Sequence, residues 1–291
     1  MEDGQIVDAR IRGKIRLEGS KSTNPVAVGD EVLIENIEDG TYRITEILPR
    51  KNHIVRRSIN LSKQTHVLAA NIDRAYLLVT LVAPTTFTAF IDRFLVAAEA
   101  YRIPTTLLFN KIDLYTEEDI EVVHDMMSIY EKIGYPCFEI SALNQTNIDF
   151  LRKEIDGKQV MIAGHSGTGK STLVNALDPT LKLKTSEISK THLQGQHTTT
   201  FAEMHQLASG GYIIDTPGIK AFGIIDLEKE VIGHYFPEMR KLLNKCKFHN
   251  CQHINEPNCV VKEAVENGEI SESRYQTYVD LIMEDRNETY R

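Results

Sequence analysis

The chain of 291 residues contains no run of 18 or more apolar residues, the length that a helix needs to cross a bilayer. Its first four residues, MEDG, are acidic and lack the basic and then apolar layout of a secretory signal. Internal repeats and low-complexity segments are also absent. A hydrophobic content of 42% is that of a globular protein with a real core. We therefore expect a cytoplasmic protein without a membrane segment.

Cysteine is scarce and unevenly distributed. There are only four, and Cys246, Cys251 and Cys259 fall close together. No CxxC pair occurs, which argues against a redox centre, and a reducing cytosol disfavours disulfides. The isolated Cys137 is predicted to be a buried core residue.

The clustered cysteines have the spacing of metal ligands. Cys246-x4-Cys251-x-His253-x5-Cys259 offers three thiolates and one imidazole, a set that binds zinc tetrahedrally in structural sites. His249 is a competing fourth ligand, because histidines flank Cys251 on both sides and spacing does not choose between them. We expect one zinc ion per chain, which would hold this loop to its flanking helices.

An overall excess of basic residues is absent as well. The formal net charge is −8, which argues against nucleic-acid binding by the chain as a whole. Basic residues nevertheless form two groups near the N-terminus: Arg10, Arg12, Lys14 and Arg16, and then Arg50, Lys51, His53, Arg56 and Arg57. Such groups are consistent both with a phosphate-binding face and with solvated strand faces.

The first 60 residues contain short runs in which polar and apolar residues alternate. Residues 4–13, 26–35 and 41–48 show this period, and glycines punctuate them as turns. The pattern predicts a small β-barrel over residues 1–63. An OB-fold is the preferred kind, although an SH3-like barrel has the same signature.

From about residue 66 the pattern changes to buried strands that alternate with helices. Apolar runs cover residues 75–79, 105–109, 159–163 and 212–214, and helical spacing covers residues 88–101 and 117–133. This alternation predicts a parallel α/β sheet with helices on both faces over residues 64–224. In the remaining domain, 225–291, residues 228–245 and 260–289 are predicted to be helices around the Cys/His cluster.

Residues 164–171 (GHSGTGKS) form a complete phosphate-binding loop between a predicted strand and a predicted helix. Glycines let backbone N–H groups wrap phosphates, and the helix N-terminus adds positive dipole. Lys170 is expected to reach the β- and γ-phosphates and to act in catalysis, and Ser171 is expected to ligate Mg²⁺. The expected phosphate-binding residues are Gly164, His165, Ser166, Gly167, Thr168, Gly169, Lys170, Ser171 and Thr172.

Two earlier motifs select the base. The NKID sequence directly follows the strand at 105–109, and its Asp113 would accept hydrogen bonds from two guanine donors that adenine lacks. A Ser-Ala-Leu loop would back the base, with the Ala142 N–H donating to guanine O6. The expected base-binding residues are Asn110, Lys111, Ile112, Asp113, Ser141 and Ala142. Asn110 is expected to tie the loops together. This set disfavours an ATP-using enzyme.

The switch motifs come last, as His197-Thr198-Thr199-Thr200 and as a DTPG sequence. Asp215 would hold Mg²⁺ through a water, and the Gly218 N–H would sense the γ-phosphate. The next position, which often orients water in GTPases, is Ile219 and cannot do so. His197 is the candidate replacement, and a solvent-exposed loop histidine is the alternative reading.

The order of these motifs is unusual. An ordinary GTPase runs from the phosphate loop through the switch threonine and DxxG to NKxD and SA. Here NKxD and SA precede the phosphate loop. The chain is therefore predicted to be circularly permuted, so that its second switch leads directly into the residues after position 220.

The motifs in this order, together with the Cys/His spacing, resemble the RsgA (YjeQ/YloQ) family of circularly permuted GTPases over essentially the whole chain. The resemblance implies an OB-fold, a permuted GTPase domain and a zinc-binding domain. It implies a partner, the 30S ribosomal subunit with its 16S rRNA, whose late maturation the protein assists by ribosome-stimulated GTP hydrolysis. The expected ligands are GTP and GDP with Mg²⁺. We expect a monomer that binds neither DNA nor membranes.

By the same likeness, His253 is the fourth zinc ligand, Thr199 is the switch residue that responds to the γ-phosphate at the Mg²⁺ site, and His197 aids hydrolysis. Where the family often has an arginine before this histidine, the chain has Gln196. No arginine contribution is therefore expected from this loop. The alternative function is a GTP-switched RNA-binding module without catalysis, which Ile219 favours and His197 disfavours.

Overall fold

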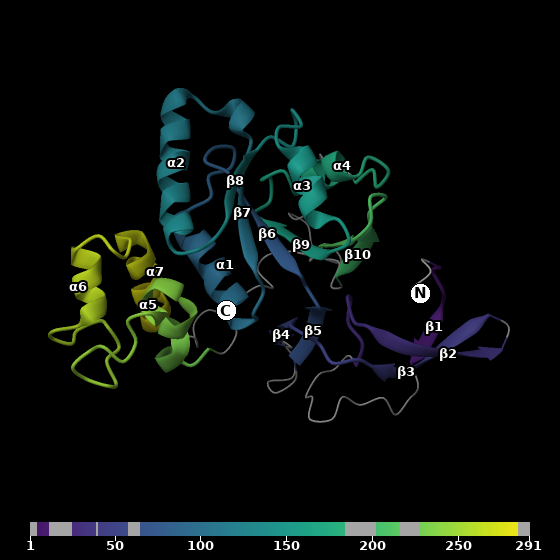
Figure 1. Ribbon diagram of the computed structural model, residues 1–291, viewed down its shortest axis with the longest axis horizontal. Coiled ribbons are helices and arrows are strands. Elements are labelled where there is room, and N and C mark those ends of the chain that lie inside the picture. Colours follow the sequence, from purple (N-terminus) through teal and green to yellow (C-terminus); the bar gives the residue numbers. More distant parts are fainter. Residues whose placement is uncertain are drawn as a thin grey trace, which may run out of the picture.

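The computed structural model describes residues 5–11, 25–38, 40–57, 65–183, 202–215 and 227–284. A six-stranded sheet forms the middle of the molecule, with a β-rich part on one side and a helical part on the other (Figure 1). In these residues, no helix is long and apolar enough to span a membrane.

The central sheet contains every apolar run that was predicted to be a strand. Its order is β10-β11-β9-β6-β7-β8, and all neighbours are parallel except β10, which runs antiparallel to β11. The strands are β6 (Arg74–Val79), β7 (Thr105–Asn110), β8 (Cys137–Ile140), β9 (Gln159–Gly164), β10 (Glu203–Gln206) and β11 (Tyr212–Asp215). The short strands β8 and β10 were not predicted.

The register places the phosphate-loop strand β9 between an earlier strand and a later one. Ile162 of β9 lies opposite Tyr76 of β6 on one side and opposite Asp215 of β11 on the other. Chain order falls from β11 through β9 to β6 and rises again through β7 to β8, so the reversal lies between β9 and β6. In open α/β sheets, ligands bind beyond the carboxyl ends of the strands at such a reversal, which is where the phosphate loop begins.

Helices cover both faces of this sheet (Figure 1). They are α1 (Thr88–Ala100) and α2 (Glu117–Lys132) on one face, and α3 (Ile148–Ile155) and α4 (Lys170–Leu177) on the other. Along β6, Leu77 packs with the first pair of helices and Leu78 with the second. Because both faces are buried, an inner strand such as β6 is apolar at every position but the first.

The predicted helices at 88–101 and 117–133 are confirmed to within a residue. Helix α2 begins with a capping box, in which the Thr116 hydroxyl accepts from the Asp119 N–H (3.2 Å) and the Asp119 carboxylate accepts from the Thr116 N–H (2.9 Å). Two N–H groups at the helix start are satisfied in this way.

The N-terminal part contains two small sheets, ordered β1-β3-β2 and β4-β5. Their strands are β1 (Ala9–Ile11), β2 (Val32–Glu38), β3 (Thr41–Ile47), β4 (His53–Arg57) and β5 (Thr65–Ala70). The expectation of a strand from residue 26 is wrong, because Gly29 turns the chain at a φ of +88° and Val28 makes only an isolated bridge. Strand β5 pairs with β4 across the predicted boundary at position 64, and the domain limits remain predictions.

A polar junction connects these strands to the start of β9. The Gln159 side chain donates to two backbone carbonyls of residues 70 and 71 (2.6 and 3.1 Å), and Asp73 accepts from the Gln159 N–H (2.7 Å). Lys51 pairs with Asp73 as well. Arg50 makes two 2.6 Å bonds to the buried carboxylate of Asp30. Two members of the second basic group are therefore ion-paired within the fold.

The C-terminal part consists of η4 (Lys229–Tyr235), α5 (Pro237–Arg240), α6 (Val260–Glu266) and α7 (Glu272–Met283). The prediction of one helix over 228–245 is wrong, because a 3₁₀ helix there gives way to a short α-helix at Pro237, which has no N–H to continue the first helix. The predicted helix 260–289 is also divided, since Gly268 turns the chain at a φ of +71°. The core of this part includes Val96 of α1.

Candidate functional site

The phosphate loop joins the carboxyl end of β9 to the first turn of α4. Gly164, Gly167 and Gly169 have φ angles of +148°, +87° and +98°. A Cβ atom on Gly169 would lie 2.5 Å from the Asn110 side-chain nitrogen. Glycine is therefore required here both by the backbone conformation and by the close approach of another loop.

Lys170 is oriented by the loop that precedes it. Its Nζ donates to the carbonyls of Gly164 (2.8 Å) and His165 (2.7 Å), and the Thr168 hydroxyl donates to the second of these carbonyls (2.9 Å). These bonds place the ammonium group against the loop backbone, where phosphate oxygens would be bound. Ser171 and Thr172 follow in the first turn of α4 and are half-buried.

Asn110 connects three loops with one buried side chain. Its Nδ2 donates to the Thr168 carbonyl of the phosphate loop (2.8 Å), and its Oδ1 accepts from the Ala142 N–H of the Ser-Ala-Leu loop (3.0 Å). The Tyr115 hydroxyl donates to the Asn110 carbonyl (2.7 Å). The Ala142 N–H is thus engaged by Asn110 in this structure, and its role as the donor to guanine O6 remains a prediction.

We expect Gly169→Ala to disrupt this connection. The new methyl group would meet Asn110, so the substitution should cost about 1–3 kcal/mol for the left-handed backbone and a similar amount for the clash. Gly268→Ala is a matched control, because Gly268 also has a positive φ but nothing lies within 4 Å of its Cβ position. The melting temperature and the nucleotide affinity should fall further in Gly169→Ala than in Gly268→Ala. Equal losses in the two variants would contradict the role of the close approach between Gly169 and Asn110.

A cavity of about 230 Å³ lies between these loops. It is lined by Asn110, Lys111, Asp113, Leu114, Ala142, Leu143, Gly169 and Thr172. The Ser141 hydroxyl donates to Asp113 and so orients the carboxylate at the cavity. Lys111 donates from Nζ to the Gly167 carbonyl (2.7 Å), and burial lowers its pKa. The cavity therefore combines a carboxylate acceptor with the apolar side chains of Leu114 and Leu143, as a purine base requires.

The remaining predicted residues belong to the switch segments. Asp215 ends β11, and its backbone lies opposite Ile162 of the phosphate-loop strand. Nothing is described of its side chain. His197, Thr199 and Gly218 lie outside the described residues, and their roles remain predictions. The Mg²⁺ site that Ser171 was predicted to share with Thr199 and Asp215 also remains a prediction.

One contact of the phosphate loop could not be read from the sequence. The His165 ring stacks on Phe90 of α1, with ring centroids 3.6 Å apart and planes inclined by 32°. Burial, and secondarily the nearby Lys170, lower the pKa of His165. The two residues are distant in the chain, and no spacing rule links them.

The Cys/His cluster assembles around one point. The donor atoms of Cys246, Cys251, His253 and Cys259 all lie within 4.8 Å of one another, and His249 does not belong to the group. The His253 Nδ1 lies 3.3 Å from the Cys259 sulfur and 3.6 Å from the Cys246 sulfur, and these sulfurs are 3.9 Å apart. Zinc bonds of about 2.0–2.3 Å in a tetrahedron require donor separations of roughly 3.5–3.8 Å. The cluster therefore fits one tetrahedral metal ion.

Helix α7 supports the metal-binding loop from one side. The hydroxyls of Tyr275 and Tyr278 donate to the carbonyls of His253 and Gln252, each at 2.7 Å. Burial raises the pKa of the Cys251 thiol to about 12. A bound cation would favour the thiolate form that a metal ligand requires.

Comparison with known proteins gives one consistent result. A family model described as RsgA GTPase matches residues 47–225. Two proteins named small ribosomal subunit biogenesis GTPase RsgA align with the whole chain: one from Christiangramia forsetii at 55% identity over 93% of that protein, and one from Bacteroides fragilis at 53% identity over 94% of that protein.

Two solved structures are also similar to this chain. The crystal structure of YjeQ from Thermotoga maritima is 39% identical, with a TM-score of 0.77, over 94% of this chain and 88% of that one. The structure of YloQ, described as a circularly permuted GTPase, is 31% identical, with a TM-score of 0.73, over 96% of this chain and 85% of that one. The predicted fold class, permutation included, is confirmed by these two structures.

Proposed function

Because the chain belongs to the RsgA GTPase family and is therefore a GTP-hydrolysing enzyme, we propose that it binds the 30S ribosomal subunit and assists its late maturation in the cytoplasm. The name shared by the relatives supports the ribosomal part of this proposal. The observation that carries the chemistry is the connection that Asn110 makes between the phosphate loop and the base-selecting loops. Such a connection holds a base and its phosphates at a fixed separation.

In this proposal GTP lies beyond the carboxyl ends of β9 and β7. Guanine occupies the 230 Å³ cavity, where the Asp113 carboxylate accepts from its N1–H and N2–H₂ groups. The phosphates follow into the loop 164–171, towards the ammonium group of Lys170. Ser171, with Thr199 and Asp215, would hold Mg²⁺, which neutralises charge on the β- and γ-phosphate oxygens.

The base assignment predicts that Asp113→Asn changes nucleotide preference. An amide replaces one acceptor by a donor, so guanine should bind about 5–150-fold more weakly, which corresponds to the 1–3 kcal/mol cost of an unsatisfied hydrogen-bonding group. Xanthosine triphosphate, whose base has an acceptor at the second position, should bind better than GTP. Equilibrium binding of both nucleotides measures this, with the surface variant Asp125→Asn as a control. Unchanged GTP affinity would show that the base binds elsewhere.

Activation of water is assigned to His197, because Ile219 leaves the usual water-orienting position apolar. The free protein is then expected to hydrolyse GTP slowly. His197→Ala should remove most of the 30S-stimulated rate, by ~10²–10⁴-fold, while GTP affinity stays unchanged, since the imidazole would act only on the transition state. Single-turnover hydrolysis with and without 30S subunits measures the stimulated and the basal rate, and equilibrium binding of GTP measures the affinity. Unaltered stimulation would mean that another group orients the water.

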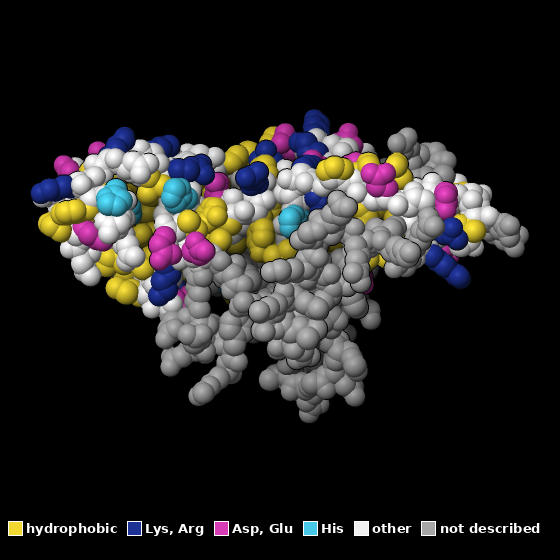
Figure 2. All heavy atoms as spheres, turned by 90° about the horizontal axis from the view of Figure 1, so that it is seen from below, with side chains coloured by type: hydrophobic (Ala, Val, Ile, Leu, Met, Phe, Trp, Pro, Cys, Tyr) yellow, Lys and Arg dark blue, Asp and Glu magenta, His cyan; other side chains and the backbone are white. Residues whose placement is uncertain are grey.

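Binding to 16S rRNA is proposed for the N-terminal β-rich part, an OB-fold in this proposal. Arg10 is exposed on β1 and lies opposite Arg43 of β3, so basic side chains come from neighbouring strands. In the view of Figure 2, basic and acidic side chains are interspersed over the described part of the surface, so charge alone does not mark an RNA-binding face. The metal ion is proposed to be a single structural zinc, and the protein to act as a monomer.

A further inference from the structure

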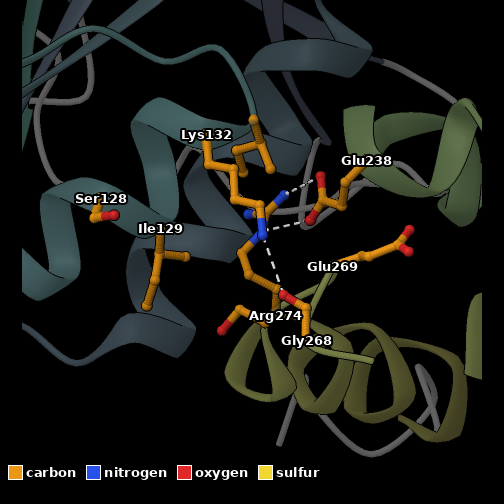
Figure 3. A pocket seen from close by; sticks show the side chains of 9 residues that line it. Ser128, Ile129, Lys132, Glu238, Gly268, Glu269 and Arg274 are labelled. Carbon is orange, nitrogen blue, oxygen red and sulfur yellow. Dashed lines mark hydrogen bonds and ion pairs between the residues drawn. The ribbon is translucent and has the colours of Figure 1, made fainter. Parts of the chain in front are cut away.

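A buried ionic cluster joins the C-terminal part to the central sheet. Arg274 of α7 is 1% exposed and donates to both carboxylate oxygens of Glu238 (2.7 and 3.1 Å). Its third bond reaches Asp92 of α1 at 3.0 Å. Figure 3 shows the guanidinium group pointing towards Glu238, at the side of a pocket that residues of α2 also line.

Asp92 is the residue on which the three helices converge. It is fully buried, and it also accepts from the Tyr130 hydroxyl of α2 and the Thr277 hydroxyl of α7, each at 3.0 Å. Buried ion pairs contribute little net stability compared with apolar packing, but they require one geometry, because each displaced partner leaves a charge without compensation. The cluster therefore fixes the position of α1 relative to α7 more strictly than apolar contacts would.

Helix α1 also contacts the phosphate loop, about half a helical turn before Asp92. Phe90 of α1 stacks on His165 with ring centroids 3.6 Å apart. The carbonyl of His165 in turn accepts from the Lys170 ammonium group at 2.7 Å. A continuous series of contacts thus runs from Arg274 through Asp92 and Phe90 to His165 and Lys170.

We propose that α1 is a rigid coupling element between the C-terminal metal-binding part and the phosphate loop, and that Arg274 and Phe90 are positioning residues for GTP hydrolysis. A helix moves as a unit, so the cluster at Asp92 sets where Phe90 holds the loop and hence where Lys170 lies. The coupling is reciprocal. A change of nucleotide at the loop therefore alters the docking of α7, and a partner that binds the C-terminal part alters the loop.

The first test is a double-mutant cycle on the basal GTPase reaction of the full-length, zinc-loaded chain. Arg274→Lys keeps the charge but loses the paired bonds, and Phe90→Leu keeps apolar bulk but loses the ring. Each should lower kcat by about 10–100-fold, as expected for a misplaced catalytic group, with a much smaller change in KM. The double variant should be no slower than the slower single variant, within about threefold. Losses that multiply would overturn the proposal, because they would mean independent effects.

Arg240→Ala is the matched control. Arg240 joins the C-terminal part to α1 through an exposed pair with Glu99 at 3.1 Å, so its loss should leave kcat unchanged. Zinc content and circular dichroism should match the unaltered protein in every variant.

The second test needs no substitution. Hydrogen exchange of the unaltered protein should differ at residues 272–283 between GDP and a non-hydrolysable GTP analogue. Identical exchange there would overturn the proposal. Neither experiment contains ribosomal subunits, so both outcomes are independent of the proposed role in subunit maturation.

Discussion

Lys170→Ala is expected to reduce GTP turnover by about 10²–10³-fold, the usual effect of removing one preorganised group that stabilises transition-state charge. The ammonium group is held against the phosphate loop by the carbonyls of Gly164 and His165. It therefore needs little reorganisation when negative charge develops on the phosphates. The fold should persist, because the apolar face of α4 packs through Leu173 and Val174.

Multiple-turnover hydrolysis measures the expected loss of turnover, and thermal unfolding measures whether the fold persists. Lys153→Ala is the control, because that lysine is exposed on α3 and lies outside the phosphate loop. Near-normal turnover in Lys170→Ala, with intact nucleotide binding, would show that the loop binds phosphate without contributing to catalysis. A collapse of thermal stability would instead mean that the two carbonyl bonds maintain the loop.

Loss of the metal ion is expected to have the largest structural effect. Structural zinc contributes roughly 10–16 kcal/mol of binding free energy to small metal-dependent folds. The loop that it would organise between α5 and α6 lies wholly within the described part of the chain and contains no helix or strand of its own. Cys251→Ser should abolish metal binding and unfold the segment around residues 246–259, followed by α6 and α7, whose core includes Cys259.

Metal analysis of the purified protein should find one zinc per chain, and circular dichroism should show the loss of helix in Cys251→Ser. His249→Ala is the control and should retain the metal, since only His253 belongs to the cluster. Retention of zinc by His253→Ala would overturn the ligand assignment. Treatment with a chelator should reproduce the effect of Cys251→Ser and should be reversed by added zinc.

The parts of the fold that were predicted correctly are those with a local signal. Strand β9, its glycine turns and α4 form one continuous stretch in which apolar period, φ requirements and a helix start all agree. Strand β10 carried no such signal, because its residues are exposed or half-exposed and it sits at the edge of the sheet. The split of the C-terminal helices was missed because their apolar spacing continues across Pro237 and Gly268.

The candidate site, too, could be predicted from the sequence only in part. The motifs name the residues that line the cavity, but not which hydrogen-bonding groups the fold uses for itself. Ala142 illustrates this, since its N–H is engaged by Asn110. Spacing alone did not separate His253 from His249; the family resemblance chose His253, and the position of its ring among the three cysteines agrees with that choice. Asp92 and Arg274 are ordinary helix residues when read alone, and their pairing depends on two helices that the chain order keeps far apart.

The rearranged strand order also bears on how the protein folds as it is synthesised. Among the strands of the central sheet, β6, β7 and β8 leave the ribosome first and can pair at once, since each neighbours the next in the sheet. The second edge of β6 has to wait for β9, about half of the central region later, and β11 follows later still. Until then one edge of β6, which is apolar from Ala75 to Val79, exposes unpaired N–H and C=O groups, which is the condition for strand-to-strand aggregation. We therefore expect the growing chain to depend on chaperones over the interval between Val79 and Gly164.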